Sequence, residues 1–534
     1  MANIEIIIIL LSFIAILSVV ADKIKISNPI LLVLLGLSLG FAPGLPMIVL
    51  NPDLVFLIFL PPLLYAAAWT TSWHDFKAAK RPISLLAIGL VLFTTSSVAV
   101  AAHYLIPGFS WPFAFILGAI VSPPDAVAAT SVTKGLGVPK RIITILEGES
   151  LVNDASGLIA YKYAVAAAVT GTFVLWEASL QFVLVSAVGI LIGLVIGWIL
   201  YKVHKLIKNN PTVDTSLTLL SPYIAYLTAE HVHSSGVLAV VTCGLFLSWR
   251  EPEMFSHDTR IQSRGVWNTV VFMLNGVVFI LIGLQLPFIL QGLSGFKFEQ
   301  IIEYGILISF VVMVIRIIWV FPAAYIPRML YKSIRIKETD TNWQGVLVIG
   351  WAGMRGVVSL AAALALPVTI KNGVAFPERD LILFIAFCVI LSTLVFQGLS
   401  LPILLKWLNV KAGNQEEEEN KHARITIATA AIVHIEENIA AFVDDNVLNQ
   451  LKHKYELRID HLNKRLPKGS NAETEANYGL FEEFTKHQKD LLKVERNMVI
   501  EMHKKGSVSE EVLRKIQAEL DFEESIINME EETL

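Results

Sequence analysis

The chain has 534 residues, of which 54% are hydrophobic and only 16% are charged. Soluble domains carry about a quarter charged residues, so this composition indicates a protein embedded in a lipid bilayer. The net charge of −4 says little about partners, but the absence of a dense basic patch argues against a nucleic-acid partner. Because no nucleotide motif or catalytic triad is evident in the sequence, it predicts neither an enzyme nor a bound cofactor.

Apolar segments of about twenty residues follow one another up to residue 408, and each can cross about 30 Å of hydrocarbon as a helix. They predict an all-α integral membrane protein of about thirteen transmembrane helices. We place these helices at 4–21, 28–48, 52–71, 82–106, 112–133, 142–165, 175–203, 214–232, 234–249, 264–292, 298–331, 343–368 and 379–408. The only plausible turn in 214–249 lies around Glu230, so twelve spans is the alternative. Glu5, with no Lys or Arg before the first segment, favours a membrane span there over a signal peptide.

The loop charges predict an orientation, because Lys and Arg are enriched in cytoplasmic loops. With the N-terminus outside, 20 Lys and Arg residues fall in cytoplasmic connections, and only Lys297, Lys371 and Arg379 fall outside. The sequence therefore predicts a multi-pass plasma-membrane protein of a bacterium-like cell, with its N-terminus outside and its C-terminus in the cytoplasm.

The last part of the chain, residues 409–534, is rich in Glu, Lys and Asn and has no segment long enough to span a membrane. It predicts a separate cytoplasmic helical domain, regulatory or interacting, that follows the transmembrane domain 1–408. Ser507 and Glu510 form a capping box for a last helix. Its role is left open between packing against itself or a dimer mate and regulation by pH or partners.

The fifth apolar segment contains two consecutive prolines, Pro123 and Pro124, followed by Asp125. Prolines remove backbone donors and clash with the preceding turn, so this helix must break at membrane depth. A broken helix is tolerated there where its freed carbonyls face protein or a water-filled cavity, and such carbonyls can coordinate a cation. The alternative is a simple proline kink.

The sixth segment carries Asp154, about twelve residues or about 18 Å from the inner end and thus near the midplane. Ser150 lies four residues earlier on the same face of the helix. Together with a carbonyl freed at Pro124, they offer the oxygen ligands that suit an alkali cation. Because a low dielectric favours the protonated carboxyl, a proton and a cation can compete for Asp154 near neutral pH. Such competition is the simplest form of antiport.

Glu149 lies about 140° around the helix from Asp154 and needs a different partner. Arg316, midway along the eleventh segment, is the candidate, because buried charges are tolerated when they are paired. We favour this structural ion pair over direct cation binding by Glu149.

The twelfth segment has three glycines, Gly350, Gly353 and Gly356, that loosen the helix around Arg355. Paired interruptions in two halves of a chain are typical of inverted-repeat transporters with a site at the repeat interface. Arg355 would neutralise exposed helix ends or hold Asp125, and the alternative is that it snorkels to water.

Four motifs together resemble the sodium/proton exchanger branch of the monovalent cation:proton antiporters. They are Phe59-Leu60-Pro61-Pro62, Ser122-Pro123-Pro124-Asp125-Ala126-Val127-Ala128, Glu149-Ser150-Leu151-Val152-Asn153-Asp154-Ala155 and Gly353-Met354-Arg355-Gly356. The resemblance extends to about residue 408 and implies a homodimer, with a dimerisation domain and a six-helix core domain in which two broken helices cross. It implies these roles: Asp154 as carrier, Ser150 as ligand, Asn153 and Asp125 stabilising the crossing, Glu149 and Arg316 as an ion pair, and Arg355 as the core arginine.

The resemblance also implies electroneutral exchange, since family members with Asn before the carrier Asp tend to exchange one cation for one proton. This chain departs from the family where Pro124-Asp125-Ala126 replaces Thr-Asp-Pro, which removes a hydroxyl but keeps the Pro124 carbonyl. We therefore predict an antiporter that exchanges Na⁺ for H⁺ in pH homeostasis, with K⁺ or Li⁺ as alternative cations. A K⁺/H⁺ antiporter is the alternative, a cation channel is the rival from another class, and an intramembrane hydrolase is a remoter third.

Overall fold

The computed structural model describes residues 2–24, 27–42, 56–133, 136–170, 175–207, 210–293, 297–332, 334, 342–369, 376, 378–410, 415–439, 448–449, 452–453, 455–456, 459, 487–499, 501–502, 505 and 510–532. Lys371 and Ser507, which the sequence analysis used, lie outside these residues. The chain forms two compact units, residues 1–411 and 412–534.

The helices of the first unit overlap the predicted apolar segments throughout the described residues. The N-terminal elements are α1 (Ala2–Ile24), α2 (Asn28–Gly40), α4 (Leu60–Thr70), α5 (Trp73–Ala78), α6 (Lys80–Ser84), the π-helical η1 (Leu85–Leu90) and α7 (Val91–Leu105). The central elements are α8 (Trp111–Val121), α9 (Ala126–Thr133), α10 (Lys140–Thr170), α11 (Leu175–Leu206), α12 (Pro211–His231), α13 (Gly236–Met254), α14 (His257–Leu284) and α15 (Leu286–Gly292). The last elements are α16 (Phe298–Leu330), α18 (Trp343–Trp351), α19 (Val357–Leu364), α20 (Arg379–Ser392), the π-helical η3 (Thr393–Gln397) and α21 (Gly398–Leu408).

Several of these helices have the length and the apolar composition of transmembrane helices. Among the described residues, 6 helical stretches are long and apolar enough to cross a bilayer, judged by length and composition, and three shorter apolar helices accompany them. The ambiguous 214–249 region forms two helices, α12 and α13. The total of thirteen spans stays a prediction.

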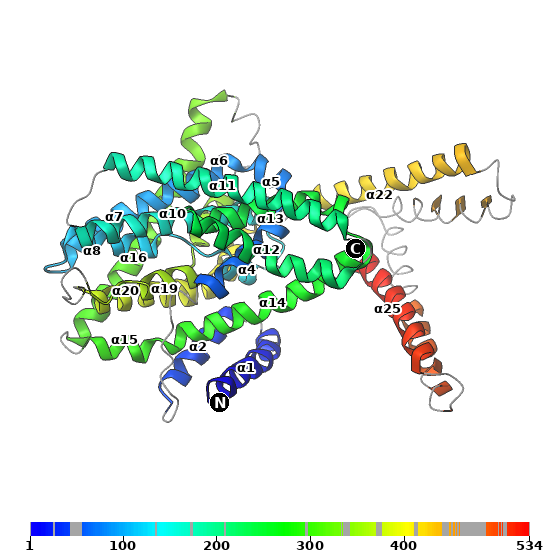
Figure 1. Cartoon of the computed structure of the whole chain (residues 1–534), viewed down its shortest axis with the longest axis horizontal. Helices are drawn as coiled ribbons and strands as arrows, with labels where there is room; N and C mark the ends of the chain where they lie inside the picture. Colours follow the sequence, from blue (N-terminus) through cyan, green and yellow to red (C-terminus); the bar gives the residue numbers. More distant parts are fainter. Residues whose placement is uncertain are drawn as a thin grey trace. The chain divides into compact units, whose positions relative to one another are not determined.

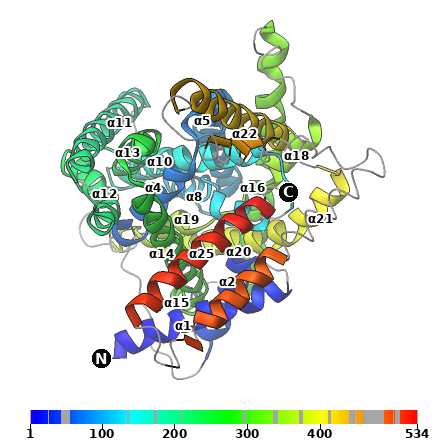
Figure 2. The same ribbon diagram turned by 90° about the vertical axis from the view of Figure 1, so that its right-hand side faces the viewer.

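The helices of this unit, which Figures 1 and 2 show from two sides, can be divided into two groups by their packing. The scaffold group contains α1, α2, α4 and α11 to α14, in which α2 packs along α14 and α13 packs on α4, α11 and α12. Small residues allow the closest approach, since a Cβ at Gly36 of α2 would collide with the Ile280 carbonyl of α14. The broken-helix group contains α6 to α10, α16 and α18 to α21, with α10 packed on α8 and α16 packed on α18 and α20.

The described residues of the second unit are helical except for a turn at Lys505. They include α22 (Gln415–His434), the π-helical η4 (Ile435–Ile439) and α25 (Glu510–Glu532). A helix over 487–499 packs on α25 through Leu492, which clusters with Leu520 and Ile527. Arg496 binds Asp521 at 2.6 Å across the same contact.

Candidate cation-binding site

The first predicted helix break is present where the two prolines lie. Helix α8 ends at Val121 and α9 begins at Ala126, so the chain between them is not helical. Asp125 stands immediately before α9, and its Oδ1 accepts the Val127 N–H at 2.8 Å. This carboxylate therefore caps the N-terminus of α9, where backbone donors have no partner within the helix.

The second break lies between Trp351 at the end of α18 and Val357 at the start of α19. The two breaks touch each other, because the Asp125 N–H donates to the Met354 carbonyl at 2.7 Å. A Cβ at Gly356 would collide with the Asp125 carboxylate, so only glycine fits there without a shift. The two interruptions, far apart in the sequence, thus form one site.

Arg355 satisfies the carbonyl end of the first broken helix. Its side chain is fully buried, and its Nε donates to the Val121 carbonyl at 3.0 Å. Its guanidinium also donates to the carbonyls of Ser122, at 3.5 Å, and Gly353. Of the two roles left open above, the structure has Arg355 at a helix end, where a cation compensates the helix dipole. Snorkelling is wrong, because the side chain has no contact with solvent.

Glu149 and Arg316 form a buried ion pair that ties three helices together. The guanidinium donates to the two carboxylate oxygens at 2.6 and 2.8 Å, and both side chains are at most 1% exposed. Arg316 also donates to the Ile349 carbonyl at 3.1 and 3.2 Å, so α10, α16 and α18 meet at this point. Glu149 is engaged here and does not line the cavity described below.

Two groups expected as cation ligands already have protein partners. The Pro124 carbonyl accepts a bond from Asn153 Nδ2 at 2.9 Å, which fixes the break against α10. The Ser150 hydroxyl accepts the Ala126 N–H at 3.2 Å, a donor that exists because this chain has Ala126 in place of proline. Carbonyl and hydroxyl oxygens each have two lone pairs, so each keeps one for a ligand.

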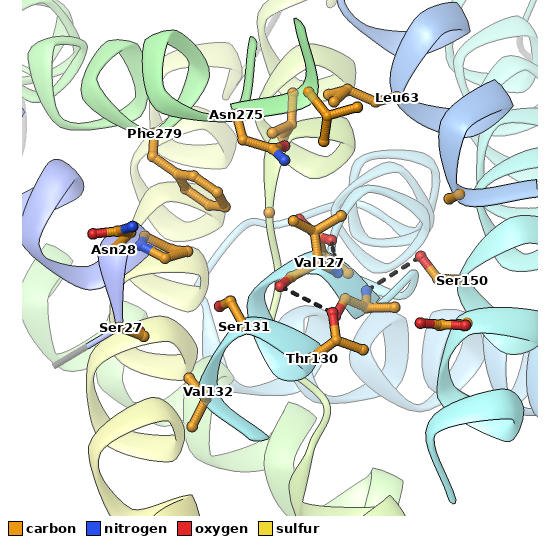
Figure 3. A pocket seen from close by; sticks show the side chains of 18 of the residues that line it. Ser27, Asn28, Leu63, Val127, Thr130, Ser131, Val132, Ser150, Asn275 and Phe279 are labelled. Carbon is orange, nitrogen blue, oxygen red and sulfur yellow. Dashed lines mark hydrogen bonds between the residues drawn. The ribbon is translucent and has the colours of Figure 1, made fainter. Parts of the chain in front are cut away.

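Asp154 lies in a cavity of about 1370 Å³ together with Asp125 and Ser150. Its side chain is 6% exposed, and within the described residues it has no hydrogen-bond or ion-pair partner. Figure 3 shows Val127, Thr130 and Ser150 on one side of the cavity and Asn275 and Phe279 of α14 on the other. The cavity is thus lined by both helix groups.

The donor set in this cavity suits a weakly held alkali cation more than a transition metal. Within the described residues, no group of three or more His, Cys, Asp or Glu side chains is arranged to hold a metal ion. The oxygens near Asp154 come from carboxylate, hydroxyl and carbonyl groups, which favour hard cations.

Sequence reasoning missed several contributors to the site. Thr393 Oγ1 accepts the Arg355 N–H at 3.0 Å and links η3 to the second break, and nothing in the local sequence signals this contact. Glu147 also lines the cavity. Its spacing of seven residues before Asp154, which places both on one helix face, was the available signal.

Two broken helices that meet beside a buried carboxylate are typical of secondary transporters, whose substrate and ion sites lie at such breaks. Residues 8–407 match the family profile "Sodium/hydrogen exchanger, transmembrane", and the chain belongs to this family.

Relatives in several bacteria are similar to the chain. It is 35% identical to the "Sodium, potassium, lithium and rubidium/H(+) antiporter" of Bacillus pumilus, over 77% of this chain and 62% of the relative. It is 32% identical to the "Uncharacterized Na(+)/H(+) exchanger YjcE" of Escherichia coli, over 89% of this chain and 90% of the relative. It is 34% identical to the "Na(+)/H(+) antiporter ApNhaP" of Aphanothece halophytica, over 72% of this chain and 70% of the relative. The match spans only 62% and 61% of the two Bacillus antiporters.

Among solved structures, the sodium proton antiporter MjNhaP1 of Methanocaldococcus jannaschii has a similar fold. The TM-score is 0.60 at 19% identity, over 76% of this chain and 99% of that one. The similarity confirms the predicted all-helical antiporter fold.

Proposed function

We propose that this chain is a secondary active antiporter that exchanges Na⁺ for H⁺, with K⁺ and Li⁺ as alternative cations. The observation that carries the proposal is Asp154, a buried carboxylate that lines a large cavity and has no partner among the described residues. A charge in such a place is costly, so the carboxylate either takes up a proton or binds a cation. Binding one or the other, but not both, couples the two fluxes.

We further propose an electroneutral exchange of one cation for one proton. Two neighbouring carboxylates are already engaged, since the partly buried Asp125 caps α9 and the buried Glu149 is paired with Arg316. Asp154 is therefore the carboxylate whose charge is free to change during transport.

The proposed movement is a displacement of the broken-helix group against the scaffold group, with the cavity between them. The cavity reaches Ala21, Thr70, Arg264 and Lys406, which all lie near helix ends predicted to be cytoplasmic. This supports an inward-facing state in the plasma membrane, with the N-terminus outside and the C-terminus inside. Large apolar side chains exposed along α11, such as Trp176 and Leu191, support contact with lipid or with a second copy in a homodimer.

Everted vesicles test this function directly. Respiration acidifies their interior, and a fluorescent dye reports the proton gradient while Na⁺, K⁺ or Li⁺ is added to the cytoplasmic face. We expect Na⁺ to dissipate the gradient, Asp154→Asn to abolish the response, and the exposed surface variant Asp258→Asn to retain it. Dissipation by K⁺ but not Na⁺ would reassign the substrate, and a steady current at zero proton gradient would favour a channel.

A further inference from the structure

A second carboxylate, Glu147, lines the cavity of Asp154 and is left unused by the exchange described so far. Glu147 is partly exposed and, within the described residues, has no hydrogen-bond or ion-pair partner. It precedes Asp154 by two helical turns of α10, so the two lie on one face about 10 Å apart along the axis. Ser150 lies between them on the same face and also lines the cavity.

Glu147 lies on the cytoplasmic side of Asp154, from which a cation would enter the inward-facing cavity. It is closer than Asp154 to the start of α10 at Lys140, an end predicted to be cytoplasmic. The hydroxyls of Thr130 and Ser131, on the neighbouring helix α9, also line the cavity. Oxygen ligands thus extend from Asp154 towards the cytoplasm.

The cavity also contains charges that oppose a cation. Arg264 and Lys406 line it together with the carboxylates Asp125, Glu147 and Asp154. Glu147 is one of three carboxylates among the five charged side chains of the lining, and the Arg264 guanidinium also lies 3.9 Å from the Glu251 carboxylate. A cation that comes from the cytoplasm passes these basic residues before it meets Asp154.

We propose that Glu147 forms an outer binding site for a monovalent alkali cation, which holds the ion in the inward-facing cavity before it moves to Asp154. The proposal rests on the function given above and extends it. A carboxylate in a cavity that hydroxyl groups also line replaces part of the hydration shell, and the second step to Asp154 then displaces the proton. The outer site raises the local cation concentration without taking part in the exchange itself.

Transport kinetics in everted vesicles give the first test. Removing a unit charge about 4 Å from the ion in a water-like medium is worth about 1 kcal/mol, so Glu147→Gln should raise the half-saturating Na⁺ concentration about fivefold. The maximal rate should change less than about twofold, because Asp154 is intact. Lys406→Gln should lower the half-saturating concentration, and Asp258→Asn, an exposed carboxylate outside the cavity, should leave it unchanged. An unchanged value in Glu147→Gln, or a loss of maximal rate alone, would overturn the outer site.

Chemical labelling tests cation binding without transport. The purified full chain carrying Asp154→Asn is treated with dicyclohexylcarbodiimide, with NaCl or choline chloride at equal ionic strength, and mass spectrometry follows the peptide that contains Glu147. Protection by Na⁺ but not by choline is expected. Equal labelling in both salts would overturn the outer site even if exchange by the natural chain is normal. Protection without exchange would reject the antiport function and leave the outer site standing.

Discussion

The buried pair of Glu149 and Arg316 allows a quantitative test of how the charged interior is held together. Replacing Glu149 with Gln keeps the size of the side chain and removes its charge. Arg316 would then stay fully buried with neutral acceptors alone, the amide oxygen of the new side chain and the Ile349 carbonyl. Removing one partner of a buried ion pair costs about 3–5 kcal/mol, because the remaining charge is uncompensated.

The double variant Glu149→Gln/Arg316→Gln removes both charges and should recover more than half of this loss. The recovery defines a coupling energy of about 2 kcal/mol or more between the two positions. If the 411 residues of the first unit unfold together, with an entropy of about 2.1 cal/mol/K per residue, the single variant should lower Tm by about 4–6 °C.

Thermal unfolding of the purified chain in detergent, followed by tryptophan fluorescence, measures these shifts. Glu299→Gln serves as the control, because this carboxylate is exposed at the start of α16 and should shift Tm by less than about 1 °C. Additive effects of the two single substitutions, or a single-variant shift no larger than that of the control, would refute the argument that the pair compensates two buried charges.

Two further substitutions test the site. Gly356→Ala should lower the transport rate at least about tenfold, because the new Cβ collides with the Asp125 carboxylate. Gly350→Ala is the control, because its Cβ would lie 3.6 Å from its nearest neighbour, and this variant should transport normally in the same vesicle assay. Ala126→Pro is compatible with the first position of α9 and removes the N–H that occupies Ser150. It should therefore strengthen apparent Na⁺ affinity about three- to fivefold, and an unchanged affinity would show that Ser150 is not a ligand.

The amino-acid sequence was enough to predict the helical elements and the location of the helix breaks. Composition and segment length predict a helical membrane protein, because only a closed pattern of backbone hydrogen bonds is tolerated in lipid. Two adjacent prolines cannot continue a helix, so the break before Asp125 follows from local chemistry. The rarity of charges inside apolar segments singled out Asp154, Glu149, Arg316 and Arg355 before any contact was known.

Which of these groups contact one another depends on how the helices pack, and it is seen only in the folded chain. Local patterns carry no information on contacts between distant segments, so the sequence left Arg355 with two possible partners, and the structure has it at the carbonyls that end α8. Two backbone hydrogen bonds were likewise unpredictable. The Asp125 N–H donates to the Met354 carbonyl, and the Arg355 N–H donates to Thr393 Oγ1. These bonds satisfy backbone groups that the breaks expose, and in a dry interior such groups must find whichever partner the packing brings near.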